Sequence, residues 1–316
     1  MRSAQIMRFG APDVLQVNDI ERPAPGPGEV LVRVEASSVN GHDVLVRSGR
    51  VRLVSGRRFP IAAGLDFAGV VVEAAPDVRG HRAGDRVWGM VHPRQRHTTA
   101  GAAEYVVVPA ARIAPAPQGV SPVDAASLVV GGATALTALR DSVRLAGGER
   151  VLVRGAAGGV GTAAVQLAHA MGGHVTALAR DRHAPALGEL GADQVLDYAD
   201  TAPEETGPFD VIVDTVGTDL GRYRRRLAAG GRMVTVSLSG AALTAIAASS
   251  VHGGRRIRTF SANPDAALLN DVAGHVACGA LRAVVAGVHP LADIAFAHGA
   301  FERGGALGKH VVAVSD

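Results

Sequence analysis

The pattern of hydrophobic and polar positions changes at about residue 150. From there to residue 237, short apolar runs alternate with segments of helical spacing. The spacing predicts strands at residues 151–153, 175–179, 194–196, 210–214 and 232–237, a helix that ends near residue 171, and helices at 184–190 and 220–227. Strands that alternate with helices indicate parallel pairing, so this part is predicted to be α/β, with a doubly wound parallel sheet.

The earlier part of the chain has a different pattern. Short β-rich segments are separated by Gly and Pro turns, without a helix after each strand; they are residues 29–34, 67–72, 85–88 and 105–108. A proline-rich stretch then leads into a helix predicted over 123–143, and the last predicted strands are 256–260 and 311–314. We therefore predict a β-rich domain at 1–120, the parallel-sheet domain at 121–258, and a return to the first domain at 259–316.

The turn after the first strand of the sheet carries the clearest functional motif. Gly155, Gly158 and Gly161 are spaced three residues apart, between an apolar strand and a helix. Small residues here allow a tight turn, let the backbone approach a pyrophosphate and let the helix pack on the strand, and the helix N-terminus favours the phosphate charge. An ordinary strand-to-helix turn is the plainer alternative. The flanking strand and helix favour a dinucleotide site.

Arg180 indicates which dinucleotide is bound. It follows the second strand of the sheet, where NAD-binding folds usually place an acid that accepts from the ribose 2′-OH. An arginine suits a 2′-phosphate instead, and Arg182 is positioned to reinforce it. In the alternative interpretation, Arg180 is solvated and Asp181 binds the ribose. The charge at the end of the strand favours NADPH over NADH.

Composition narrows the class of protein. The chain has 316 residues, is 47% hydrophobic and 19% charged, and is long enough for two folded domains. We find no apolar run of the ~20 residues that a membrane helix needs and no apolar signal core, so we expect a cytoplasmic protein without a membrane partner.

Cys278 is the single cysteine of the sequence, which excludes an internal disulfide and a multi-thiolate metal site. The net charge is +3 without a dense basic run, so no nucleic-acid partner is expected.

Ordered motifs along essentially the whole chain resemble the zinc-free quinone oxidoreductase branch of the medium-chain dehydrogenases/reductases, the zeta-crystallin-like group. They are Val39-Asn40 with Asp43, residues 64–71, 83–87, 103–105, 155–161, 190–193, 214–217 and 230–232, and Gly308-Lys309. The resemblance implies a GroES-like catalytic domain, a Rossmann domain, a nicotinamide in the cleft between them, and a homodimer.

Together with the glycine loop and the two arginines, the resemblance gives a set of expected cofactor-binding residues. They are Thr134, Gly155, Ala157, Gly158, Gly159, Val160, Gly161, Arg180, Arg182, Val216, Ser237 and Lys309.

The zinc ligands of the zinc-dependent relatives are missing. Those relatives have a Cys-Gly-Thr-Asp-like segment and a Gly-His-Glu segment, where this chain reads Asn40-Gly41-His42-Asp43 and Gly64-Leu65-Asp66. The chain is therefore expected to bind no metal. His92 and His97 belong to a polar insertion that we interpret as a loop over the cleft.

Without zinc, hydrogen bonds must polarise the acceptor. Asn40, in the position of a ligand cysteine, is the first candidate catalytic residue, since its amide is able to hold the nicotinamide carboxamide or the acceptor oxygen. His42, which aligns with the proton-relaying hydroxyl residue of alcohol dehydrogenases, is the second, as a proton donor. A loop histidine that faces solvent is the alternative for His42. Asp43 is expected to brace the loop.

The resemblance implies hydride transfer from NADPH to a quinone or an activated carbonyl compound. Tyrosines that many relatives carry are absent near Leu45 and at Ala102, and the resulting open pocket suits a bulky intermediate of secondary metabolism at least as well as a simple quinone. One alternative is an enoyl reductase of polyketide or acyl thioesters. A second is an NADPH-binding protein without hydride chemistry, which includes a regulatory or RNA-binding role.

Overall fold

The computed structural model describes residues 1–52, 58–92, 100–237, 239–251, 256–260 and 262–315. The chain forms two compact units. Unit 1 comprises Met1–Val130, Asn263–Ala277 and Ala283–Asp316, and unit 2 comprises Gly131–Ala262 and Cys278–Arg282. The units divide inside the continuous helix α3 (Pro122–Leu136), whereas the predicted boundary lies before this helix. Residues 278–282 join unit 2, where Gln166 exchanges two hydrogen bonds with the backbone of Arg282 (2.9 and 3.1 Å).

Unit 2 contains a parallel sheet whose described strands have the order β11-β10-β9-β12-β13-β14. Their bounds are β9 Arg150–Arg154, β10 His174–Ala179, β11 Gln194–Asp197, β12 Phe209–Asp214, β13 Leu227–Thr235 and β14 Ile257–Thr259. This is the Rossmann order 3-2-1-4-5-6, in which ligands bind where the order reverses, here between β9 and β12. The predicted fold class is confirmed.

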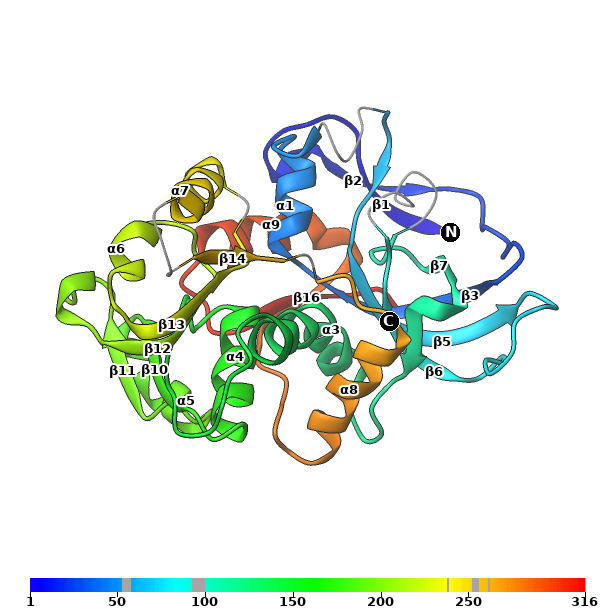
Figure 1. Ribbon diagram of the computed structural model, residues 1–316. Helices are drawn as coiled ribbons and strands as arrows, with labels where there is room; N and C mark the ends of the chain where they lie inside the picture. Colours follow the sequence, from blue (N-terminus) through cyan, green and yellow to red (C-terminus); the bar gives the residue numbers. More distant parts are fainter. Residues whose placement is uncertain (53–57, 93–99, 238, 252–255, 261, 316) are drawn as a thin grey trace. The chain divides into compact units, whose positions relative to one another are not determined.

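Helices cover both faces of this sheet (Figure 1). They are α4 (Gly159–Ala170) and α5 (Ala184–Glu189) on one side, and α6 (Leu220–Arg224) and α7 (Gly240–Val251) on the other. The helix predicted to reach residue 227 stops at Arg224, because the buried Leu227 already starts β13.

The helix predicted over 123–143 is α3 followed by a π-helical turn, Thr137–Ser142. The whole stretch, Pro122–Ser142, is long and apolar enough by composition to cross a membrane, contrary to the expectation that the chain has no apolar run of this length. Because 72% of its apolar window is buried inside the protein, it has the character of a core helix.

Unit 1 is built mainly from two sheets. In the described chain one has the order β15-β16-β3-β5-β6-β8 with β7 also paired to β3, and the other has the order β2-β1-β4. Their strands are β1 Arg2–Ile6, β2 Leu15–Asp19, β3 Glu29–Ser38, β4 Ile61–Ala62, β5 Asp66–Ala74, β6 Arg86–Met90, β7 Tyr105–Pro109, β8 Ile113–Pro115, β15 Val285–Pro290 and β16 Lys309–Ala313. The helices are α1 (Gly41–Arg47), α8 (Ala266–Ala277) and α9 (Ile294–Arg303).

The strands of unit 1 are longer than the apolar pattern predicted. Strand β3 continues to Ser38 and β5 begins at Asp66, both beyond the apolar runs. Strand β3 pairs with β5 on one side and with β16 on the other, where Ser38 lies opposite Val311. The ends of these three strands therefore bring polar residues together in unit 1.

Candidate functional site

The glycine loop joins β9 to α4 in unit 2. Gly155 has φ +71°, and a Cβ there would lie 2.3 Å from Thr215 Oγ1. A Cβ on Gly161 would lie 2.1 Å from the carbonyl oxygen of Gly155. Both positions therefore need glycine for reasons internal to the fold: a left-handed turn at the first, and close contact of helix and strand at the second.

Gly158 is a different case. It is the exposed N-cap of α4 with φ −76°, and a Cβ there would meet only the oxygen of Gly155, at an ordinary 3.4 Å. The first hydrogen bond of α4 runs from Thr162 N to Gly158 O (2.8 Å). The N–H groups of Gly159, Val160 and Gly161 are thus without acceptors inside the helix, and they fit a pyrophosphate held on the N-terminus.

Arg180 lies at the carboxyl end of β10. Its side chain is 44% exposed, with Nη1 3.6 Å from Asp197 Oδ1 and the guanidinium carbon 5.2 Å from the ring centre of Tyr198. Asp197 also accepts hydrogen bonds from the backbone N–H groups of Ala199 and Asp181. These two bonds lower the pKa of Asp197, and the charge of Arg180 lowers it further. Arg180 is thereby anchored beside an acid and an aromatic ring at the edge of the sheet.

Tyr198 was not identified from the sequence. It is 55% exposed and follows β11 directly. The available signal in the sequence was a tyrosine shortly after the strand predicted at 194–196.

Other predicted cofactor residues follow the same edge of the sheet. Val216, 46% exposed, lies beside Gly155, and Ser237 lies against Gly217. Thr134 is on α3 one turn after Gly131, where a Cβ would meet Gly159 O at 2.8 Å. The exposed Arg182 lies in the short turn after Arg180, and Ala157 is in the loop itself. The structure thus gathers the predicted residues of unit 2 at the carboxyl ends of β9, β10, β12 and β13.

A buried ion pair, which the sequence pattern did not predict, lies directly before the glycine loop. Arg154 donates to Asp214 Oδ1 and to Thr218 O (2.8 Å), and its guanidinium carbon lies 3.8 Å from the ring centre of Tyr223. The other oxygen of Asp214 accepts from Thr235 Oγ1 (2.7 Å) and from a backbone N–H. Burial raises the pKa of Asp214, and Arg154 opposes that shift. Arg154, Asp214 and Thr235 thus link the carboxyl ends of β9, β12 and β13.

In unit 1, Asn40 is the buried N-cap of α1, and its side-chain amide is fully hydrogen-bonded. Nδ2 donates to Ser38 O (3.0 Å) and to Asp66 Oδ2 (2.9 Å), and Oδ1 accepts from Lys309 Nζ (2.5 Å). Both N–H groups of the amide are therefore used inside the protein. This differs from the expectation that the amide donates to the acceptor or the nicotinamide, because the sequence did not show Asp66 beside it. Asp43 does brace the loop, since Oδ2 accepts from Asn40 N (3.0 Å).

Asp66 and Lys309 lie on either side of Asn40 in this cluster, which also contains the carboxylate of Asp43. Asp66 is fully buried and accepts from Ser38 N (2.6 Å) and Ser38 Oγ (2.5 Å) as well as from Asn40. Burial raises the pKa of Asp66, and Lys309 is the strongest of the groups that oppose this shift. Burial lowers the pKa of Lys309, and the carboxylates of Asp66 and Asp43 oppose that shift.

Lys309, expected among the cofactor-binding residues, has its hydrogen-bond partners in unit 1 rather than in the glycine loop: Asn40 and Val39 O (2.9 Å). His42 is half-buried in the first turn of α1. His97 lies outside the described residues. Within the described part of the chain, no group of three or more His, Cys, Asp and Glu residues is arranged to hold a metal ion.

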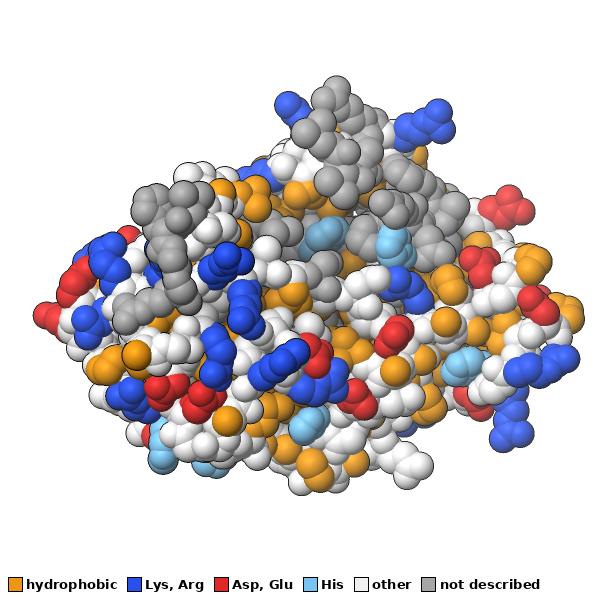
Figure 2. Space-filling model, viewed as in Figure 1, with side chains coloured by type: hydrophobic (Ala, Val, Ile, Leu, Met, Phe, Trp, Pro, Cys, Tyr) orange, Lys and Arg blue, Asp and Glu red, His pale blue; other side chains and the backbone are white. Residues whose placement is uncertain are grey.

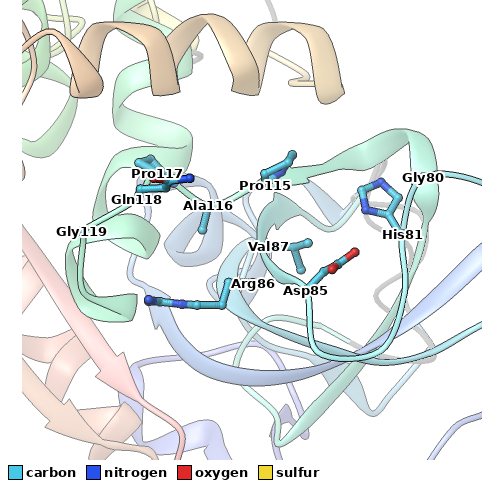
Figure 3. A pocket seen from close by; sticks show the side chains of 10 residues that line it. All are labelled: Gly80, His81, Asp85, Arg86, Val87, Pro115, Ala116, Pro117, Gln118 and Gly119. Carbon is cyan, nitrogen blue, oxygen red and sulfur yellow. The ribbon is translucent and has the colours of Figure 1, made fainter.

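A hollow of about 420 Å³ lies elsewhere on unit 1 (Figure 3). It is lined by Gly80, His81 and Asp85 from the turn before β6, by Arg86 and Val87, and by residues 115–119. None of the predicted site residues is among these lining residues, so the hollow has no part in the candidate site.

Comparison with known proteins places this architecture in a family. Residues 26–118 match the alcohol dehydrogenase GroES-like domain, and residues 190–312 match the family described as zinc-binding dehydrogenase. The chain is 31% identical to an Arabidopsis thaliana protein named chloroplast envelope quinone oxidoreductase homolog, over 92% of this chain and 91% of that protein. It is 38% identical to the human mitochondrial NAD(P)H oxidoreductase RTN4IP1 over 60% of this chain, a match that spans about half (52%) of the human protein. It is also 34% identical, over 73% of this chain, to 11% of a Mycobacterium tuberculosis polyketide synthase named mycocerosic acid synthase-like.

Solved structures agree with this placement. The quinone oxidoreductase of Coxiella burnetii superimposes with a TM-score of 0.90 at 30% identity, over 100% of this chain and 99% of that chain. A mycobacterial protein complexed with NADPH superimposes with a TM-score of 0.84 at 26% identity, over 99% and 100% of the two chains. The chain belongs to the zinc-free quinone oxidoreductase branch of the medium-chain dehydrogenase/reductase superfamily.

Proposed function

We propose that this protein is an NADPH-dependent, zinc-independent oxidoreductase that transfers hydride to a quinone or an α,β-unsaturated carbonyl acceptor. The observation that carries the proposal is the glycine loop. Gly155 and Gly161 are required by the fold, whereas at Gly158 the protein leaves room for a side chain beside the open N-terminus of α4. A glycine that the fold does not need, next to unpaired helix N–H groups, supports a phosphate ligand.

The residues of unit 2 would hold NADPH along the carboxyl edge of the sheet. Gly158 to Gly161 would bind the pyrophosphate, and Arg180, with Tyr198 beside it, would receive the 2′-phosphate of the adenosine. Arg182, Val216, Ser237 and Thr134 complete the proposed set. When bound, NADPH supplies a hydride. A relative named NAD(P)H oxidoreductase and a structural neighbour complexed with NADPH support a nicotinamide cofactor.

An enoyl reductase is the second candidate function. The match to a segment of a protein named as a polyketide synthase favours it. The homodimer, the cytoplasmic location and the absence of a nucleic-acid partner stay predictions. On the face seen in Figure 2, basic and acidic side chains are intermixed, which gives no support to a nucleic-acid surface.

Consumption of NADPH in the presence of quinones, enones and enoyl thioesters tests the proposal. Reduction of quinones or enones supports it, and reduction of enoyl thioesters alone favours the second candidate. A protein that binds NADPH and reduces none of these compounds would be a binding protein without hydride chemistry.

Arg180→Ala is expected to weaken NADPH binding and leave NADH binding unchanged, because Arg180 meets only the 2′-phosphate. A charge-assisted hydrogen bond contributes about 1.5–3 kcal/mol, so the Kd for NADPH should rise roughly 10- to 100-fold. Fluorescence titration with both cofactors measures this. Arg222→Ala is the control, since Arg222 is an exposed arginine of the same unit paired with Glu204. Equal affinity of the unmodified protein for NADPH and NADH would contradict the assignment.

A further inference from the structure

The chain contains a single lysine. Of its 32 lysine and arginine residues, every one except Lys309 is an arginine. Lys309 is also buried, with 6% of its surface exposed. A compact ammonium and a planar guanidinium are not interchangeable in a confined polar site, so lysine at this position calls for a specific explanation.

The ammonium of Lys309 is held by two acceptors. Nζ donates to Val39 O (2.9 Å) and to Asn40 Oδ1 (2.5 Å). An ammonium has three N–H donors. Among the described residues, none forms a hydrogen bond with the third.

Asn40 connects this cation to a buried carboxylate. Its Nδ2 donates to Asp66 Oδ2 (2.9 Å), while its Oδ1 faces Lys309. A carboxylate accepts and an ammonium donates, so the two charges fix which end of the amide faces which neighbour. Asp66 is fixed in turn by Ser38, whose N–H and hydroxyl both donate to it.

Asn40 links the ammonium to the segment that carries Asp66, because its amide bonds to both. Asn40 stands where the zinc-dependent relatives have a ligand cysteine, and Asp66 ends the segment whose ligand histidine is here Leu65. Neighbouring strands β5, β3 and β16 place Asp66, the loop with Asn40, and Lys309 together. The sheet thus positions a cation one amide away from a buried carboxylate.

We propose that the Lys309 ammonium is the built-in cation of the acceptor site, positioned by Asn40 and Asp66 to stabilise the negative charge that develops on the acceptor oxygen. This inference rests on the proposed function and assigns the acceptor class: compounds whose carbonyl oxygen becomes an anion. The acceptor carbon gains one hydrogen and two electrons from hydride, the C=C electron pair moves toward the carbonyl oxygen, and the third N–H of Lys309 donates to that oxygen. A proton from water then neutralises the product, and Lys309 keeps its own proton.

In this arrangement Asn40 and Asp66 are positioning residues, which act through Lys309. The ammonium is lost as pH rises through its pKa, which burial lowers and the carboxylates of Asp66 and Asp43 raise. The rate should therefore fall on the alkaline side. Asp66→Asn removes one of the carboxylates that raise the pKa of Lys309. The fall in rate should therefore begin at a lower pH in this variant. Such a shift would not follow from a purely structural role.

Kinetics of four variants test the inference: Lys309→Met, Lys309→Arg, Asp66→Asn and the double variant Lys309→Met/Asp66→Asn. Lys309→Met should lower kcat by about 10²-fold, the usual loss for one oriented oxyanion donor, with little change in KM for NADPH. Lys309→Arg should retain part of the rate. The double variant removes one positive and one negative charge and so restores the charge balance of the native cluster. Its Tm should therefore recover toward that of the native protein while kcat stays low. His310→Asn, the next residue on β16 and outside the cluster, is the control and should keep the native kcat.

Recovery of both Tm and kcat in the double variant would overturn the proposal, as would an unchanged kcat in a folded Lys309→Met protein. A measurement on the native protein covers the case in which the variants do not fold. Selective ¹⁵Nζ labelling of lysine gives one side-chain resonance, which should shift when 4-nitrophenolate, a mimic of the oxyanion, is added with NADP⁺.

If the resonance does not move, the inference is wrong even when the native enzyme reduces acceptors. If it moves but the native protein oxidises NADPH with none of the acceptors, the proposed function fails while the anion-binding role of Lys309 stands.

Discussion

Gly158→Val is expected to give a folded protein that no longer binds NADPH. The Cβ at this position meets only Gly155 O, at 3.4 Å, so the fold accommodates it. The same Cβ and its methyl groups would stand in front of the N-terminus of α4, where the pyrophosphate is proposed to bind. Thermal unfolding followed by circular dichroism would check the fold, and fluorescence titration with NADPH would check binding.

Two other glycines provide the comparison. Gly161→Val should lose binding and fold together, because its Cβ would lie 2.1 Å from a backbone oxygen that has no room to move. Gly188→Val, in α5 with no atom within 4 Å of the new Cβ, should keep native affinity and fold, since valine has a higher helix propensity than glycine. Native NADPH affinity in the folded Gly158→Val protein would remove the phosphate site from this loop.

Asp214→Ala is expected to lower the free energy of unfolding by about 3–5 kcal/mol, the usual cost of breaking a buried ion pair by removing one partner. Arg154 would be left buried without its counter-ion, and Thr235 Oγ1 would lose its acceptor. Urea unfolding would measure the change. The double variant Arg154→Met/Asp214→Asn leaves no buried charge and should be less destabilised than Asp214→Ala.

Asp210→Ala is a matched control on the same two strands. Asp210 pairs with Arg150 across β12 and β9 at 3.1 Å, but side chains of this pair are 29% and 48% exposed. An exposed pair contributes about 0–1 kcal/mol, so this variant should differ little from the native protein. Equal losses in Asp210→Ala and Asp214→Ala would show that burial of the second pair has no energetic consequence.

The parallel sheet and the glycine loop were predictable because their signals are local. The apolar runs of β9 and β10 and the three glycines lie within 31 consecutive residues, from Arg150 to Arg180. Spacing along one segment is enough to identify a strand, a turn and a helix.

The two buried charged clusters could not be predicted in this way. Arg154 and Asp214 are 60 positions apart, and Lys309 and Asn40 are 269 apart. They meet only through the register of neighbouring strands, which the sequence does not display. In unit 1, Ser38 ends β3 and Asp66 begins β5. Both residues are polar because they belong to the cluster around Asn40, so they interrupt the apolar pattern from which strands are predicted. The predicted strands were therefore too short.

The position of the single lysine also allows local opening of the chain to be measured by proteolysis. A protease that cuts only after lysine has one target, the peptide bond between Lys309 and His310, and both residues lie buried in β16 between β15 and β3. The bond becomes a substrate only when β16 leaves the sheet. The rate of this single cut therefore reports how often unit 1 opens, independently of any event in unit 2.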